Sequence, residues 1–334
     1  HWLDQARYAD SVGYEKDNAR PLAWVWRDWV FMSINDDLPF DRFTIAQLAG
    51  DLIPEGTPQQ HLATGFHRQT LFNREGGVDP EEDRTKRTID RSSTVARTWL
   101  GLTLECAQCH DHPYDPVTMR DFYRFYAFFN AADEQSIKLR GEKGTRKQEA
   151  HVMKANSERK TYLFHRGDFL QPDHEGGEVT AGTPASLPPL DTRDPDHPDR
   201  LDLARWLVAP ENGLTARVAV NTIWLHLFGA GLCSTPENFG SQGALPSHPA
   251  LLDWLAQTFR AEGWSRKALI RRIVLSRTYR QSSLHRPEVA KRDPDNRLLS
   301  RQNRRRVEAE IVRDLHLAAA GLLTRRIGGR SVFP

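Results

Sequence analysis

Two cysteines with two residues between them, followed directly by a histidine, constrain this chain more than any other stretch. Cys106, Cys109 and His110 have the spacing that attaches c-type haem. Residues three apart share one face of a helical turn, so both thiols can reach the vinyl groups on one edge of a porphyrin. Histidine is a standard axial ligand of haem iron. The motif predicts one haem c, anchored through thioethers at Cys106 and Cys109, with His110 as the proximal iron ligand.

Three other uses of this cysteine pair stay open at the level of sequence. A zinc site needs four ligands; His112 could join Cys106 and Cys109, but the local set of ligands stays incomplete. The remaining cysteine, Cys233, stands alone. A redox-active pair usually lies beside a βαβ pattern, which this stretch lacks. A structural disulfide across the turn is the third alternative to haem.

The sixth coordination position of the iron has two candidate ligands. His112 cannot reach it, because His110 holds the opposite face of the haem only two residues away. His67 is the first candidate, and Met119 is the second, since Met/His ligation suits electron transfer. An open position would instead suit small-molecule chemistry at the iron.

Polar and acidic residues flank the motif region. A polar rim beside the motif consists of Asp111, His112 and Asp115. We expect these side chains either to orient His110 or to cap the loop that follows the motif. A long helix is expected from about Glu81 to Leu104, with the cysteines at its end. The acidic residues at its start are Glu75, Asp79, Glu81, Glu82 and Asp83. The helix dipole favours acidic side chains there, and a cation site is the alternative.

Composition excludes several classes of function. The chain has 334 residues, a net charge of +2 and 27% charged residues, so it has no overall attraction to nucleic acid or to a membrane surface. No apolar run reaches the ~20 residues that span a bilayer, and we expect no membrane span in this fragment. The sequence contains neither a glycine-rich phosphate loop nor a nucleophile elbow. The chain starts at His1 without a leader pattern, so we expect a piece of a longer protein.

The pattern of apolar residues predicts a mainly α fold with two helical domains joined by a small β-containing connector. We assign residues 1–132 to the first domain and 199–334 to the second. In the connector, 133–198, the charged stretch 133–160 predicts a surface segment. Thr161–His165 predicts a short strand. A last helix is expected from about Arg304 to Leu323.

Several runs of residues in both halves resemble known families. In the first half the runs are Phe40–Phe43, Gln47–Leu52, Ala63–His67 and Trp99–Thr103, which leads into Cys106–Pro116. They resemble the planctomycete cytochrome-type domain. In the second half the runs are Arg200–Leu207, Leu214–Asn221, Thr235–Gly240, Pro246–Leu255, Tyr279–Ser282 and Asp293–Leu299. They resemble the domain of unknown function that usually follows it. The resemblance implies an exported protein, whose haem is inferred from the same Cys-x-x-Cys-His signature.

Together these features predict an exported, envelope-associated protein that transfers electrons through one covalent haem. Bacterial machinery attaches such haems outside the cytoplasmic membrane, which indicates a periplasmic or otherwise exported location. The partner would be a redox protein, with the second domain as a docking or recognition module. Two alternatives stay open: a haem enzyme that acts on an exported substrate, and a non-redox surface protein that binds polysaccharide or another protein. In the latter, the motif binds zinc or forms a disulfide.

Overall fold

Local capping signals determine where several helices begin and end. The Thr118 side chain accepts from the Asp121 backbone N–H, and Asp121 accepts from Thr118 in return, at the start of α6 (Met119–Asn130). Ser265 caps α10 (Arg266–Val274). Gly229, with φ +84°, ends α8 (Gly213–Phe228) in a left-handed conformation that glycine adopts without strain. Each of these three signals lies in the sequence directly at the helix end that it determines.

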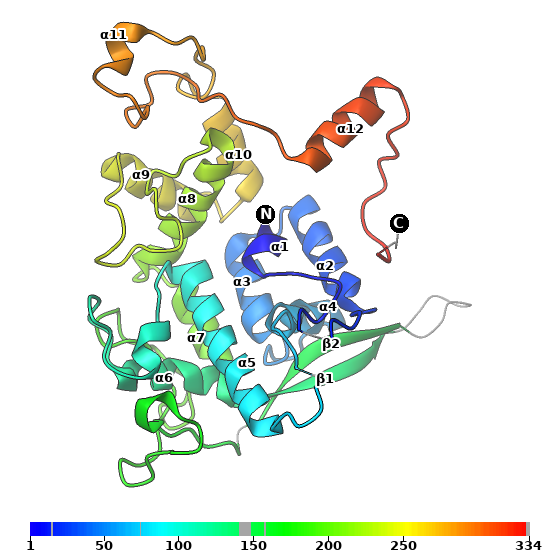
Figure 1. Cartoon of the computed structure of the whole chain (residues 1–334), viewed down its shortest axis with the longest axis vertical. Helices are drawn as coiled ribbons and strands as arrows, with labels where there is room; N and C mark the ends of the chain where they lie inside the picture. The colour runs from blue at the N-terminus through cyan, green and yellow to red at the C-terminus, as the bar shows by residue number, and fades with distance from the viewer. Residues whose placement is uncertain (15, 74, 140–147, 157, 332–334) are drawn as a thin grey trace.

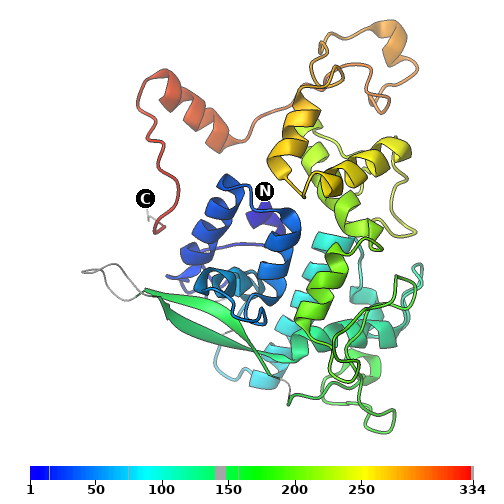
Figure 2. The same cartoon turned by 180° about the vertical axis from the view of Figure 1, so that it is seen from behind.

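The computed structural model describes residues 1–14, 16–73, 75–139, 148–156 and 158–331. Within them the fold is mainly α, as predicted, with one pair of strands between two helical regions (Figures 1 and 2). The first region contains α1 (Trp2–Gln5), α2 (Ala23–Asn35), α3 (Phe40–Ala49), α4 (Pro58–Ala63), η1 (Thr64–Arg68), α5 (Pro80–Val95), η2 (Ala96–Leu100), η3 (Glu105–Gln108) and α6. After the strands come η4 (His165–Gly167), α7 (Arg200–Val208), α8, α9 (Pro249–Ala261), α10, α11 (Pro287–Ala290) and α12 (Ala309–Ala319).

The two strands form an antiparallel hairpin beside α2 and α4 (Figure 1). β1 (Ala132–Leu139) pairs with β2 (Gln148–Ala155), and the first residue of β1 lies opposite the last residue of β2. Ala150 and Val152 of β2 pack in a small apolar cluster with Val25 of α2. This contact gives the hairpin one buried face against the first helical region.

The hairpin corrects two predictions for the connector. It occupies much of the stretch 133–160, so the described residues there form paired strands with one buried face and not only a surface segment, while 140–147 lie outside them. The strand predicted at 161–165 is also wrong, because this run forms only one isolated bridge, between Phe164 and Pro172. The connector does contain strands, but they come earlier in the chain than expected.

One apolar core continues through both helical regions. It includes Trp99 and Phe122 from the first region and Leu203 and Phe259 from the second, each at most 1% exposed. α3 packs against α7, and α8 packs against α9 and against η2. The domain limits at 132 and 199 stay predictions, because apolar packing crosses both of them.

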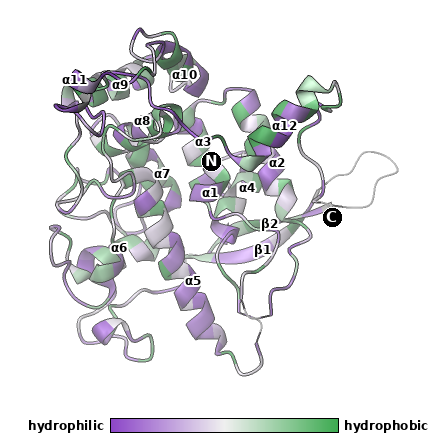
Figure 3. Ribbon diagram, turned by 45° about the horizontal axis from the view of Figure 1, so that its top comes forward, coloured by the Kyte–Doolittle hydropathy of each residue, from purple (hydrophilic) through white to green (hydrophobic). Residues whose placement is uncertain are grey.

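The helix α12 lies apart from the rest of the fold (Figures 1 and 2). It is shorter at both ends than the predicted last helix. Its apolar side chains Ile311 and Leu315 are 43% and 58% exposed, and Figure 3 shows green stretches along this helix. The chain then returns to α2, where the Gly329 N–H donates to the Asp28 carboxylate at 2.6 Å. Neither α12 nor any other helix in the described residues is long and apolar enough to cross a membrane.

Candidate functional site

The cysteine motif lies on a short 3-10 turn and not on the end of a long helix. α5 ends at Val95 and continues as one π-helical turn, η2. Gly101 then takes a left-handed backbone conformation with φ +62°, which ends the helix. The predicted extension to Leu104 is therefore wrong, and the motif begins on η3.

Both cysteines and the following histidine are accessible to solvent. Cys106, Cys109 and His110 are exposed, and both thiols are free. Ala107, between the cysteines, is fully buried in the apolar core. Ala107 therefore holds the turn to the core, while the three side chains that the motif predicts for haem stay accessible. The disulfide alternative is not formed in the described structure.

The His110 imidazole has a defined tautomer. Its Nδ1 lies 2.7 Å from the Asp111 carbonyl oxygen. A carbonyl oxygen only accepts, so Nδ1 carries a proton, and in the neutral imidazole the lone pair is then on Nε2. A ring N–H bonded to a backbone carbonyl is a common way of orienting metal-ligating histidines. The Nε2 atom of His110 is therefore free to bind iron.

His112 closes the loop that follows the motif. Its Nδ1 accepts from the backbone N–H groups of Asp115 at 2.8 Å and Tyr114 at 3.3 Å, and its side chain is 5% exposed. This nitrogen is therefore not available to zinc. Within the part of the chain that the structure describes, no three His, Cys, Asp or Glu side chains gather as ligands of a metal ion. The geometry supports loop closure by His112 and not a zinc site with Cys106 and Cys109.

A loop from the second helical region holds the chain after the motif. It spans residues 235–243, and we call it the clamp loop. The Asp115 carboxylate accepts from the Ser241 backbone N–H at 2.6 Å and from the Ser241 hydroxyl at 2.7 Å. Gly240 is so close that a Cβ there would lie 2.3 Å from the Asp115 carboxylate. Asp115 belongs to the predicted polar rim, but its partner, 126 positions away, leaves no local signal in the sequence.

The clamp loop also holds the chain before the motif. The Phe239 N–H donates to the Gly101 carbonyl at 2.7 Å. The Phe239 ring lies against Gly101, where a Cβ would come within 2.8 Å of it. Glycine at this position therefore ends the helix and also makes room for the clamp loop. The loop contacts the chain on both sides of the motif.

Two further contacts support the motif turn. The Tyr123 hydroxyl of α6 donates to the Gln108 carbonyl at 3.1 Å. Burial raises the pKa of Tyr123, so the hydroxyl stays protonated as a donor. Gly167 of η4 lies against Cys109, where a Cβ would be 2.7 Å from the thiol sulfur. Three separate parts of the chain, α6, η4 and the clamp loop, thus hold this turn.

Comparison with protein-family models matches both helical regions. Residues 1–134 match PSCyt2, described as a protein of unknown function (DUF1549), and residues 199–334 match PSD1, described as a protein of unknown function (DUF1553). The chain is a PSCyt2–PSD1 domain pair. This confirms the resemblance seen in the sequence and places the cysteine motif in the cytochrome-like PSCyt2 domain. No curated protein and no solved structure matches the chain.

The two candidates for the sixth iron ligand lie in different surroundings within the PSCyt2 domain. His67 is 1% exposed in the core, and its Nε2 donates to the Leu48 carbonyl at 3.1 Å. Burial lowers the pKa of His67 well below its usual range, and Arg200 adds to this effect, so the imidazole is neutral. Met119 adjoins the motif, because its N–H donates to the Asp111 carboxylate at 2.7 Å. The contacts bring Met119 to the motif and hold His67 in the core.

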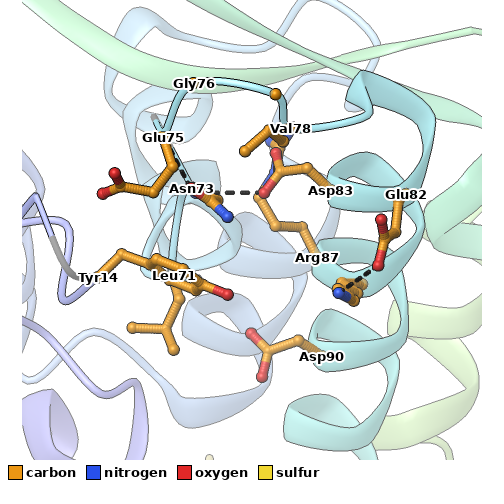
Figure 4. Close-up of a pocket in the computed structure, with 12 residues that line it drawn as sticks. Tyr14, Leu71, Asn73, Glu75, Gly76, Val78, Glu82, Asp83, Arg87 and Asp90 are labelled. Atoms are coloured by element: carbon orange, nitrogen blue, oxygen red, sulfur yellow. Dashed lines mark hydrogen bonds and ion pairs between the residues drawn. The ribbon is translucent and has the colours of Figure 1, made fainter.

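A cavity of about 450 Å³ lies beside the acidic residues at the start of α5 in the PSCyt2 domain (Figure 4). Asp79 caps α5 and accepts from the Glu82 N–H at 3.0 Å. One turn further along, Lys86 pairs with Glu82, and Arg87 pairs with Asp83 at 2.8 Å. These contacts give Asp79, Glu82 and Asp83 a role at a helix N-terminus, as predicted, and leave the cation alternative without support.

Proposed function

We propose that the PSCyt2–PSD1 pair is a c-type haem protein that transfers electrons through one haem attached to Cys106 and Cys109. The observation that carries the proposal is a set of accessible groups on one turn: two free thiols and a histidine whose Nε2 lone pair is unused. These residues fit the group, since two thiols add to two vinyl groups and one imidazole binds the iron. A haem bound here supplies a one-electron couple between ferric and ferrous iron.

The residues around the motif would determine how the iron is coordinated. His110 would be the proximal ligand, oriented by the Asp111 carbonyl. We propose Met119 for the sixth position, because its backbone is bonded to the motif segment and Met/His ligation suits electron transfer. His67 is the weaker candidate, because it would have to leave the core and give up its bond to the Leu48 carbonyl.

The proposal includes export of the protein, since bacterial cells attach haem c outside the cytoplasmic membrane. The protein would then act in the periplasm or elsewhere in the cell envelope, where it would exchange electrons with a redox partner protein. The exposed motif lies at the protein surface, where such a partner can approach.

Production with haem c maturation machinery tests the proposal. We expect a sharp α band in the reduced-minus-oxidised spectrum, and a haem that resists extraction with acidified acetone. The double variant Cys106→Ser/Cys109→Ser should lose covalent haem. Cys233→Ser is the control and should keep it, because Cys233 is buried and bonded to the Ala244 carbonyl, a bond that serine can also make.

The same experiment identifies the alternatives. Protein without the α band contradicts the proposal, and one bound zinc ion per chain, or a Cys106–Cys109 disulfide, then supports a non-redox surface protein that binds polysaccharide or another protein. A ferrous haem that binds carbon monoxide has an open position and supports a haem enzyme acting on an exported substrate.

A further inference from the structure

We propose that the clamp loop of the PSD1 domain positions the cysteine motif of the PSCyt2 domain, with Ser241 as a positioning residue. The loop contacts the chain on both sides of the motif, at Gly101 and at Asp115. This inference deepens the proposed function and rests on it for the role of the haem. The clamp itself is a property of the protein without haem.

The clamp loop has a defined shape of its own. Thr235 Oγ1 donates to the Asn238 carbonyl at 2.7 Å and accepts from the Ala244 N–H at 2.9 Å. Just before the loop, the N–H and C=O of Cys233 bond to the side-chain amide of Asn221 in α8, at 2.9 and 3.0 Å. The Asn221 side chain is fully buried. The loop is therefore fixed to α8, which enables it to hold another segment in place.

A series of hydrogen bonds connects Ser241 to the motif. Its backbone N–H and hydroxyl hold the Asp115 carboxylate, which is 8% exposed. The Asp115 N–H donates to His112 Nδ1 at 2.8 Å, and the His112 N–H donates to the Val117 carbonyl at 2.8 Å. These bonds close the loop directly after His110. Fixing Asp115 therefore fixes the direction in which the chain leaves His110.

The contact before the motif requires a residue without a side chain. Gly101 has φ +62°, and the Phe239 ring occupies the space that a Cβ would need. Arg97 of η2 pairs with Glu105, the first residue of η3, and lies 3.9 Å from Glu237 of the clamp loop. The apolar contact of Phe239 with Gly101 and the ion pairs of Arg97 thus hold the chain just before the motif.

Holding both ends of the segment reduces the conformational freedom of a turn whose functional side chains stay exposed. A segment ordered before its ligand arrives loses less entropy when the ligand binds. The clamp therefore favours one geometry for haem attachment. It also connects the PSD1 domain to the proposed iron ligand of the PSCyt2 domain.

Hydrogen–deuterium exchange of the protein without haem tests the clamp. Ser241→Ala removes the hydroxyl donor, and Asp115→Asn removes the carboxylate charge. We expect exchange over residues 105–117 to become about fivefold faster in Ser241→Ala, the factor that the loss of one ordinary hydrogen bond gives. Asp115→Asn should also speed exchange over these residues, because a neutral amide oxygen accepts the two Ser241 bonds more weakly than a carboxylate does. Ser241→Thr keeps the hydroxyl on an exposed side chain and should keep the wild-type rate.

Ser265→Ala is the matched control. Ser265 also bonds from the PSD1 domain to an aspartate of the PSCyt2 domain, Asp37, but it does so at α10, which is well separated from α6 in Figure 1. This variant should lower the melting temperature without changing exchange over residues 105–117. Wild-type exchange in Ser241→Ala, or the same acceleration in Ser265→Ala, would overturn the clamp.

The haem-loaded protein provides a second measurement. Ser241→Ala should shift the reduction potential and Ser265→Ala should not, because only the first variant loosens the segment of the iron ligand. If the wild-type protein takes up no covalent haem, the proposed function fails. The hydrogen–deuterium exchange experiment then still shows whether the clamp loop positions the motif. If haem is attached and Ser241→Ala matches the wild type in both measurements, the clamp is wrong and the proposed function stands.

Discussion

One carboxylate in the PSCyt2 domain has three guanidinium partners. Glu134 of β1 lies 3.1 Å from Arg68 of η1, and it also pairs with Arg87 and Arg91 of α5. Burial alone would raise the pKa of Glu134, but the positive charges outweigh burial and lower the pKa to about 2. The ionised carboxylate therefore holds η1, α5 and the hairpin together.

Glu134→Gln should destabilise the protein at pH 7 by about 3–5 kcal/mol, since it leaves largely buried guanidinium groups without their carboxylate. Wild-type stability should fall as the pH drops from the ordinary carboxyl pKa of 4.5 toward 2, because the unfolded carboxyl group binds its proton first. The variant should lose this part of the pH dependence. Urea denaturation over the range from pH 7 to pH 3 measures both effects.

Glu82→Gln is the control for this prediction. Glu82 pairs with Lys86 on α5, and their side chains are 43% and 67% exposed. Exposed pairs contribute about 0–1 kcal/mol, so this variant should have nearly wild-type stability. Equal losses in the two variants would contradict the role given to Glu134.

At the scale of elements, the helices are more predictable than the strands because their signals are local. Thr118 and Ser265 cap helices through their own first turns, and Gly229 ends one through its own backbone. The hairpin has few inward apolar side chains, such as Ile137 and Val152, among charged neighbours. Its sequence therefore resembles a surface segment, and the pairing depends on tertiary contacts that no local pattern contains.

The candidate site likewise has features that local sequence predicts and features that depend on contacts between distant residues. Spacing alone identifies Cys106, Cys109 and His110, because haem attachment depends on neighbours in the sequence. Gly101 ends the helix before the motif, although apolar residues on both sides of it continue the helical pattern. The clamp contact at Asp115 is not readable from sequence, since its partner lies in the other domain.

Gly101→Ala tests both the end of the helix and its contact with the clamp loop. A positive φ alone costs alanine about 1–2 kcal/mol. This is the whole loss expected for Gly263→Ala, where φ is +73° and no atom lies within 4 Å of the new Cβ. Gly101→Ala should lose about 1–3 kcal/mol more, because its Cβ would meet the Phe239 ring. Chemical denaturation compares the two, and equal losses would count against the contact with Phe239.

At the scale of the whole molecule, a buried ion pair joins the two domains. Arg200 of α7 donates two hydrogen bonds to the Asp51 carboxylate, at 2.7 and 3.0 Å, and their side chains are 2% and 3% exposed. Arg200 also donates to the Leu48 carbonyl at 2.8 Å. α3 and α7 pack against each other here. The contact between the PSCyt2 and PSD1 domains therefore has the burial of a protein core.

Asp51→Asn should destabilise both domains together by about 3–5 kcal/mol, because Arg200 stays buried without a counter-charge. We expect one cooperative transition in scanning calorimetry, for the wild type and for the variant, since both domains share one core. Asp314→Asn is the control and should cost about 0–1 kcal/mol, because Asp314 and its partner Arg313 are 56% and 71% exposed. Two separate transitions would contradict a shared core.

The packing of α3 against α7 also limits how such chains can be recombined. A chimera that joins this PSCyt2 segment to a PSD1 segment from a relative would need an arginine at the place of Arg200 and side chains that fit the surface of α3. A chimera in which the two segments are joined at the connector without these matches would leave poorly packed apolar side chains between α3 and α7. We therefore expect substitutions on α3 to be accompanied by compensating substitutions on α7 wherever the two segments diverge.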